Sequence, residues 1–223
     1  MITLDKEQIQ FIDKYLKDKG IGYWDIRLEM TDHIACEMES KSGSYDFQTL
    51  FMQILDQLGW RGDLKAYEKR RLRLINKKIR KKYFSYFTGL FTSIKTLTPV
   101  VFFVFAYYLI FQNFSSKVFN IISLMLFGLP IVYFTIHYAY MSIKFKKSGY
   151  LLYGYFYIIF SMLMSNLFYQ LPKLGGAFEV SEVVRQNIIF FTTIFNVLLI
   201  FSGVKIYLET TRQYKNLQNK LTS

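Results

Sequence analysis

Residues 98–114 read TPVVFFVFAYYLIFQNF, a stretch that contains no charged side chain. A helix needs about 20 mostly apolar residues to cross the hydrocarbon core of a bilayer, so this stretch predicts a membrane span. Three further apolar stretches follow at about 118–140, 150–171 and 186–207. The sequence therefore predicts a multi-pass membrane protein of the all-α class, with four spans forming a helical bundle.

Local signals suggest where the spans begin and end. Thr98 is expected to cap the first span, with Pro99 at the first helical position, where its missing N–H costs nothing. The motif FGLP at 127–130 predicts a kink in the second span. Pro172 is expected to end the third span, and Tyr207 lies near the end of the fourth.

The flanks of the spans differ in basic charge, which predicts their orientation. One set of flanks is basic: residues 61–96 hold 12 Lys and Arg, the loop between the second and third spans holds Lys144, Lys146 and Lys147, and the C-terminal segment holds Lys205, Arg212, Lys215 and Lys220. The opposite loops hold only three basic residues, which are Lys117, Lys173 and Arg185. We therefore expect both termini to be cytoplasmic and the protein to lie in the cell (inner) membrane.

Charge also divides the chain along its length. Residues 1–60 carry 6 basic and 11 acidic side chains, whereas residues 61–96 carry 12 basic and 2 acidic ones. Such a change in composition predicts separate parts. We expect a cytoplasmic helical domain at 1–60, a basic juxtamembrane connector helix at 61–96, a four-span domain at 97–208 and a cytoplasmic tail at 209–223.

The predicted spans lack charged residues near their centres. Because buried Asp, Glu, Lys and Arg usually mark ion or proton pathways, the sequence disfavours a proton-coupled pump. We expect the polar residues of the spans to form hydrogen bonds between helices; these are Asn166, Gln170, Asn196 and the pair Thr192 and Thr193. A transporter or transport-accessory role for a small or hydrophobic solute stays open as the alternative.

The loop 172–186 is the longest predicted segment on the non-cytoplasmic side. Glu179, Glu182 and Arg185 stand at the helical spacing of three and predict local charge pairs. A metal or ligand sensor in this loop is an open alternative.

The basic connector has the period of an amphipathic helix. One face carries Leu72, Ile75, Ile79, Tyr83, Tyr86 and Leu90. Basic helices beside a span attract anionic lipid headgroups, at about 1 kcal/mol per charge. The candidate lipid-binding residues are Arg70, Arg71, Arg73, Lys77, Lys78, Arg80, Lys81 and Lys82. No recognisable nucleic-acid-binding module accompanies this charge, so we do not expect nucleic acid as a partner.

Three short helices are predicted before the connector. The first has Asp5 and Gln8 as a capping box and ends at Gly20, and the third begins near Asp46 and ends at Gly59. The second helix is expected to turn one face inward, made of Trp24, Leu28, Thr31, Ala35 and Met38, with Met30 and Ile34 alongside. The chain's one cysteine, Cys36, excludes an intrachain disulfide.

The second and third of these helices resemble HAAS-type and permease-prefix domains, which are small helical cytoplasmic domains that precede membrane spans in bacterial proteins. The residues that carry the resemblance are Asp32 and His33, Glu37, the helix start at Gly43, Ser44 and Asp46, and the closing pair Leu58 and Gly59. The chain departs from the pattern at Trp60. The resemblance implies a regulatory or protein-interaction domain, sometimes encoded with PadR-like transcription factors.

Glu29, His33 and Glu37 are spaced four apart and so share one helix face. Carboxylates and imidazole at this spacing can bind a transition metal, but one helix face supplies three ligands at most. The favoured interpretation is a solvated acidic face with His33 hydrogen bonded between helices. Glu29, Asp32, His33 and Glu37 are the candidate partner-binding residues.

The sequence thus favours a membrane-anchored regulatory or interaction protein whose acidic helical domain binds a cytoplasmic protein. No nucleophile, metal-ligand set or phosphate-binding motif is recognisable in the spans, so neither an enzyme nor a cofactor is predicted. Homo-oligomerisation stays open.

Overall fold

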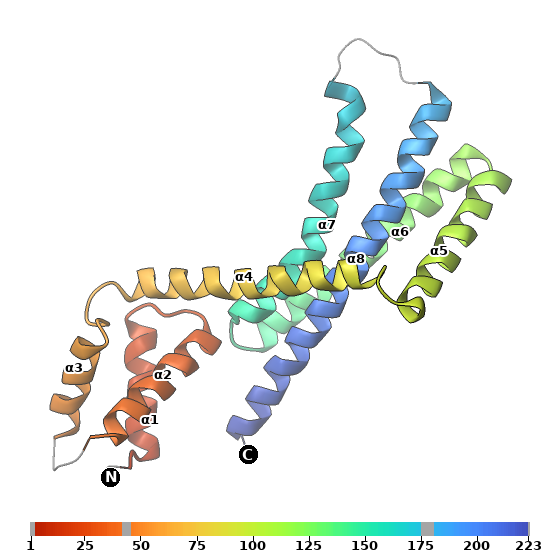
Figure 1. Ribbon diagram of the computed structural model, residues 1–223. Helices are drawn as coiled ribbons and strands as arrows, with labels where there is room; N and C mark the ends of the chain where they lie inside the picture. The colour runs from red at the N-terminus through yellow and green to blue at the C-terminus, as the bar shows by residue number, and fades with distance from the viewer. Residues whose placement is uncertain (1–2, 42–45, 175–180, 223) are drawn as a thin grey trace. The chain divides into compact units, whose positions relative to one another are not determined.

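The computed structural model describes residues 3–41, 46–174 and 181–222, which form eight α-helices (Figure 1). They are α1 (Lys6–Asp18), α2 (Trp24–Glu39), α3 (Phe47–Gln57), α4 (Leu64–Gly89), α5 (Ile94–Asn113), α6 (Ser116–Lys144), α7 (Gly149–Leu174) and α8 (Glu182–Thr222). The last four are long and apolar enough to cross a membrane. The predicted all-α class is confirmed, and the four long apolar helices indicate a multi-pass membrane protein.

The chain forms two compact units. The N-terminal unit comprises residues 1–77 and 144–150, and the C-terminal unit comprises residues 78–143 and 151–223. Helices α4 and α7 each continue from one unit into the other. The predicted domain boundaries at 60, 96 and 208 stay a prediction.

The two outer helices of the N-terminal domain begin where the local sequence predicts. Gln8 N–H donates to Asp5 Oδ1 at 2.8 Å, and Asp5 N–H donates to Gln8 Oε1 at 3.0 Å, which confirms the capping box at α1. Asp46 caps α3 by accepting Thr49 N–H at 3.0 Å, and this bond lowers the pKa of Asp46. Gly20 and Gly59 follow α1 and α3 with φ of +97° and +66°, a backbone conformation that favours glycine.

Helix α2 packs against both α1 and α3, so it buries a broader strip than the sequence predicts. Trp24, Thr31 and Met38 are buried as expected, but Leu28 and Ala35 are only half-buried. The strip is centred near Ile34 and runs from Ile26 on one side to Trp24 on the other. Residues 28 and 35 lie just beyond the Trp24 side because each step along a helix turns by about 100°.

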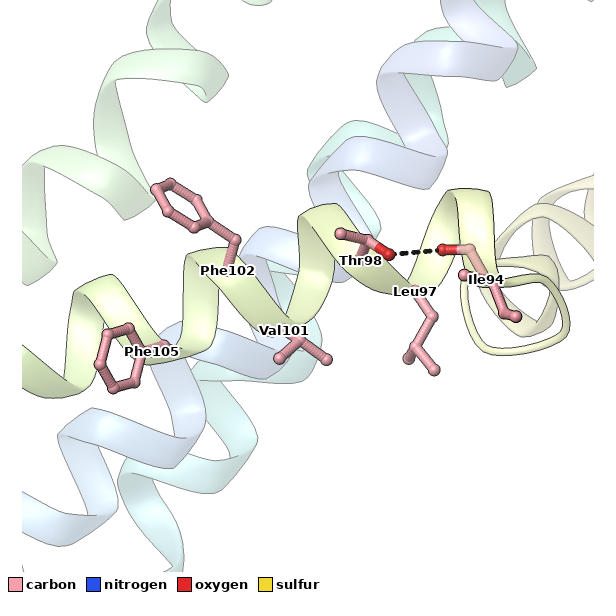
Figure 2. A pocket seen from close by; sticks show the side chains of 6 residues that line it. All are labelled: Ile94, Leu97, Thr98, Val101, Phe102 and Phe105. Atoms are coloured by element: carbon pink, nitrogen blue, oxygen red, sulfur yellow. Dashed lines mark hydrogen bonds between the residues drawn. The ribbon is translucent and has the colours of Figure 1, made fainter.

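The predicted start of the first span is wrong. Helix α5 begins at Ile94, with Ser93 as the N-cap, and Pro99 lies inside it. The earlier turn forms because Leu97 N–H donates to Ser93 O at 2.8 Å. Figure 2 shows Thr98 Oγ1 donating to Ile94 O, at 2.8 Å, so the predicted capping residue bonds backward within the helix.

Two other helices run farther than predicted. Helix α7 continues to Leu174, beyond Pro172. Helix α8 has 41 residues, so it is about 60 Å long and exceeds the thickness of the hydrocarbon core about twofold. It therefore continues well past Tyr207. Helix α6 is continuous through Pro130, and its kink stays a prediction.

Helices α7 and α8 approach closely in the C-terminal unit. A Cβ on Gly203 would lie 2.9 Å from the carbonyl oxygen of Tyr157, and one on Gly154 would collide with Thr210. Small residues allow backbones to approach in this way. An aromatic cluster of Tyr107, Phe119 and Phe190 joins α5, α6 and α8.

Candidate functional site

A carboxylate of α2 closes the N-terminal end of α7. Asp25 Oδ2 accepts Ser148 Oγ–H at 2.8 Å and Tyr150 N–H at 3.0 Å, while Asp25 Oδ1 accepts Gly149 N–H at 3.0 Å. The first N–H groups of a helix have no partner within the helix, and a negative charge is favourable there. Asp25 therefore acts as the cap of a helix more than a hundred residues away in the sequence.

Further contacts hold the segment before α7 in the N-terminal unit. Trp24 N–H donates to Lys147 O at 2.8 Å, and Lys146 Nζ lies 5.7 Å from the centre of the Trp24 ring. A Cβ on Gly149 would come within 2.9 Å of Leu72 on α4. The start of α2, the segment 144–150 and the first half of α4 thus form one packed region.

Helix α4 binds α2 through two carboxylates. Glu68 Oε1 accepts Gly22 N–H at 2.7 Å and Tyr23 N–H at 2.9 Å, just before α2 begins. Arg71 forms an ion pair with Glu29, and this hydrogen bond raises the pKa of Arg71. Two residues of the predicted binding surfaces, one acidic and one basic, therefore bind each other.

A buried charge ties α2 to α1. Arg27 is only 5% exposed, and its Nε donates to Asp13 Oδ1 at 2.6 Å. Its Nη1 also donates to the carbonyl oxygen of Ile21, at 3.2 Å. A buried guanidinium needs such partners, because an unpaired one is costly.

The predicted partner-binding residues all lie on α2. Asp32, His33 and Glu29 are exposed, and Glu37 is half-buried. His33 contacts the ring of Trp60, with centroids 5.7 Å apart. The predicted hydrogen bond of His33 is wrong, since this ring contact takes its place in the described part of the chain.

Trp60, where the chain departs from the family pattern, is buried between elements. Its ring centroid lies 4.9 Å from that of Tyr67 on α4. Burial raises the pKa of Tyr67. Trp60 thereby links the end of α3 to the first turn of α4.

The predicted lipid-binding residues all lie on α4. Arg71 and Lys82 are half-buried and form ion pairs with Glu29 and Glu209, respectively. The hydrogen bond to Glu209 raises the pKa of Lys82. The other six are exposed; they are Arg70, Arg73, Lys77, Lys78, Arg80 and Lys81.

The polar residues of the spans differ from expectation. Gln170 Nε2 donates to Asn166 Oδ1 within α7, at 3.0 Å, because residues four apart share a helix face. Asn196 on α8 is fully buried, and neither atom of its amide has a hydrogen-bond partner among the described residues. The predicted interhelical bonds are therefore wrong for Asn166, Gln170 and Asn196, and they stay a prediction for Thr192 and Thr193.

Helix α5 carries a shallow apolar groove of about 390 Å³ on its outer side (Figure 2). It is lined by Ile94, Leu97, Thr98, Val101, Phe102 and Phe105. An apolar surface on a membrane-spanning helix is suited to contact with lipid chains. The one polar side chain in its lining is Thr98, whose hydroxyl donates to Ile94 O.

Charge pairs at the start of α8 follow the predicted spacing. Arg185 Nη2 donates to Glu182 at 2.9 Å, and Glu179 lies outside the described residues. Across residues 3–41, 46–174 and 181–222, no three His, Cys, Asp or Glu side chains come together as a metal-binding group.

No protein-family model, curated protein or solved structure matches this chain. The comparisons therefore identify no family. The structure supports only an all-helical protein with four long apolar helices.

Sequence reasoning missed Asp25 and Glu68. Both accept backbone N–H groups of residues distant in sequence, at 148–150 and at 22–23. One signal was present: Ser148 precedes a long apolar helix that begins at Gly149 and has no acidic residue in its first turn. That signal indicates an uncapped helix but does not identify the capping residue.

Proposed function

We propose that this protein is a membrane-anchored regulatory or interaction protein. Its helical N-terminal unit binds a cytoplasmic protein, and the binding is relayed to the third span, α7. In this proposal both termini and the loop 144–150 are cytoplasmic, and the protein lies in the cell (inner) membrane. It acts without a catalytic centre or a cofactor.

The bonds between Asp25 and residues 148–150 are the observation that carries the proposal. They support a topology in which the N-terminal unit and the loop before α7 lie on the same side of the membrane, which agrees with the distribution of basic residues. They also give a partner that moves α2 a direct way to release or strengthen the cap of α7.

The surface proposed for the partner is the acidic side of α2. Asp32 and His33 are exposed there, and Glu37 is half-buried. Glu29 is paired with Arg71, so it forms the border of this surface with α4. A basic surface on the partner would complement these carboxylates.

The experiment is site-specific photo-crosslinking in cells with the full-length protein. A photoreactive residue at position 32 is expected to yield a discrete adduct with one cytoplasmic protein, and Glu37→Lys is expected to weaken it. The control position is Gln53, exposed on α3. The proposal fails if position 32 gives no adduct, or only the adducts that position 53 gives.

A second candidate function is a transporter or transport-accessory subunit. It is favoured by one observation, the unpartnered amide of Asn196. Helices α7 and α8 are antiparallel where they meet, because Gly154 of α7 lies against Thr210 of α8 and Tyr157 of α7 lies against Gly203 of α8. This register brings Ser165 of α7 to the level of Asn196 on α8. Ser165 Oγ is also buried without a described partner. Movement of a solute into liposomes by the purified protein, abolished by Asn196→Leu, would favour this function.

A further inference from the structure

We infer that the C-terminal half of α4 is an interfacial helix whose exposed face binds anionic phospholipid of the bilayer. The lipid-binding surface is made of Arg80, Lys81 and Phe84 on α4 and of Phe91, two residues after the helix ends. The inference goes beyond the proposed function, because it depends on neither the protein partner nor the cap of α7.

The contacts of the C-terminal half of α4 with α8 indicate how deep this half lies in the bilayer. Tyr83 Oη–H donates to Leu199 O at 3.4 Å, and the Phe87 ring lies 5.9 Å from that of Phe195. Both of these α8 residues belong to the uncharged stretch 186–204. The buried side of α4 therefore reaches the apolar part of the span.

The neighbouring contacts of α4 are with the charged end of α8. Tyr86 Oη–H donates to Glu209 Oε2 at 2.8 Å, and Lys205 Nζ lies 4.2 Å from the centre of the Tyr86 ring. Lys205 is the first charged residue after the apolar stretch. Residues 83–87 thus lie at the level where α8 changes from apolar to charged, which is the depth of the bilayer interface.

The exposed face of α4 at this level combines charge with aromatic surface. Arg80 and Phe84 are spaced four apart and share a side of the helix, and Lys81 lies next to them. Phe84 is 45% exposed, and Phe91, in the segment after α4, is 48% exposed. Large apolar side chains exposed to water would be unfavourable, whereas at the interface they enter the acyl region.

Charge selects the lipid. From Lys69 to Leu90 the chain has no acidic residue, and Arg80 and Lys81 are both exposed. Long basic side chains extend toward headgroups while their stems cover apolar surface. The arrangement fits phosphate headgroups above and acyl chains beside the two phenyl rings.

The test uses the full-length protein in nanodiscs of phosphatidylcholine with phosphatidylglycerol, where either lipid carries brominated chains that quench indole fluorescence. Phe84→Trp supplies the probe, and the parent protein, whose Trp24 and Trp60 are both buried, supplies the background. We expect stronger quenching by brominated phosphatidylglycerol than by brominated phosphatidylcholine at equal mole fraction. Each charge removed in Arg80→Gln and Lys81→Gln is expected to lower this preference about fivefold.

Two matched controls separate this face from general effects. Phe102→Trp places the probe on an exposed α5 position without charged neighbours in the sequence, and we expect equal quenching by both lipids. Lys14→Gln with Lys17→Gln removes the same charge from the exposed side of α1 and should leave the preference unchanged. The inference is overturned if the probe at position 84 is quenched by neither lipid, or equally by both. It is also overturned if the α1 pair lowers the preference as much as the α4 pair does.

Discussion

Asp25 accepts the backbone N–H of Tyr150 at 3.0 Å, although 125 positions separate the two residues in the sequence. The same carboxylate accepts the N–H of Gly149 and the hydroxyl of Ser148. A helix of the N-terminal domain thereby supplies the cap of a predicted span.

Replacing this cap should destabilise the protein. Asp25→Ala removes both acceptor oxygens, and loss of an N-cap costs about 1 kcal/mol. We expect the Tm of the full-length protein in detergent to fall by about 2–4 °C. Asp25→Asn, which keeps one carbonyl acceptor, should have a smaller effect. Asp32→Ala, at an exposed position of the same helix, should have almost none; equal losses for Asp25→Ala and Asp32→Ala would contradict the capping role.

The pair of Arg27 and Asp13 should matter more than an exposed pair. Asp13→Ala leaves the buried guanidinium without its carboxylate, and we expect a loss of about 1.5–3 kcal/mol in the free energy of unfolding. Asp56→Ala breaks the exposed pair with Arg61 and should cost less than about 1 kcal/mol. Thermal or denaturant unfolding compares them, and a larger effect of Asp56→Ala would refute the account of α1 and α2.

The close approach of α7 and α8 depends on Gly203. The Cβ of Gly203→Ala would meet the backbone of Tyr157 and Ile158, which cannot move aside as a side chain can. We expect a loss of about 1–3 kcal/mol, typical of overpacking. Gly128→Ala on α6 meets no atom within 4 Å and should be neutral or stabilising. Unfolding in detergent measures both, and the packing account fails if the two variants behave alike.

The local parts of this fold could be predicted, and the distant contacts could not. The Asp5–Gln8 capping box and the cap at Asp46 involve residues three apart, so the sequence alone indicates them. The sequence misplaces the start of α5 because serine and threonine are both favoured at N-caps, so Ser93 and Thr98 are equal candidates. A proline inside a helix is costly but tolerated, as Pro99 is in α5.

The candidate site was predicted only in part. The acidic side of α2 could be recognised from its spacing, but Glu29 is paired with Arg71, 42 positions away. Asp25 has no distinguishing neighbour in the sequence, since the groups that it caps lie in another part of the chain. Pairings of this kind follow from tertiary packing, which periodicity does not reveal.

The buried amide of Asn196 gives a test of the two candidate functions. An unpaired polar group in an apolar environment is unfavourable, so Asn196→Leu should leave the Tm unchanged or raise it. Under the proposed function, crosslinking at position 32 should be unaffected by this substitution. A fall of several degrees in Tm would instead indicate that the amide has a hydrogen-bond partner, which would remove the observation that favours transport.

The central claim is that Asp25 joins the N-terminal domain to the first turn of α7, and amide hydrogen exchange tests it most directly. The N–H groups of Gly149 and Tyr150 should exchange slowly in the full-length protein and in the Asp32→Ala variant. In Asp25→Ala their exchange should be at least about tenfold faster, because these N–H groups have no partner within the helix. Equal exchange rates in all three proteins would contradict the account.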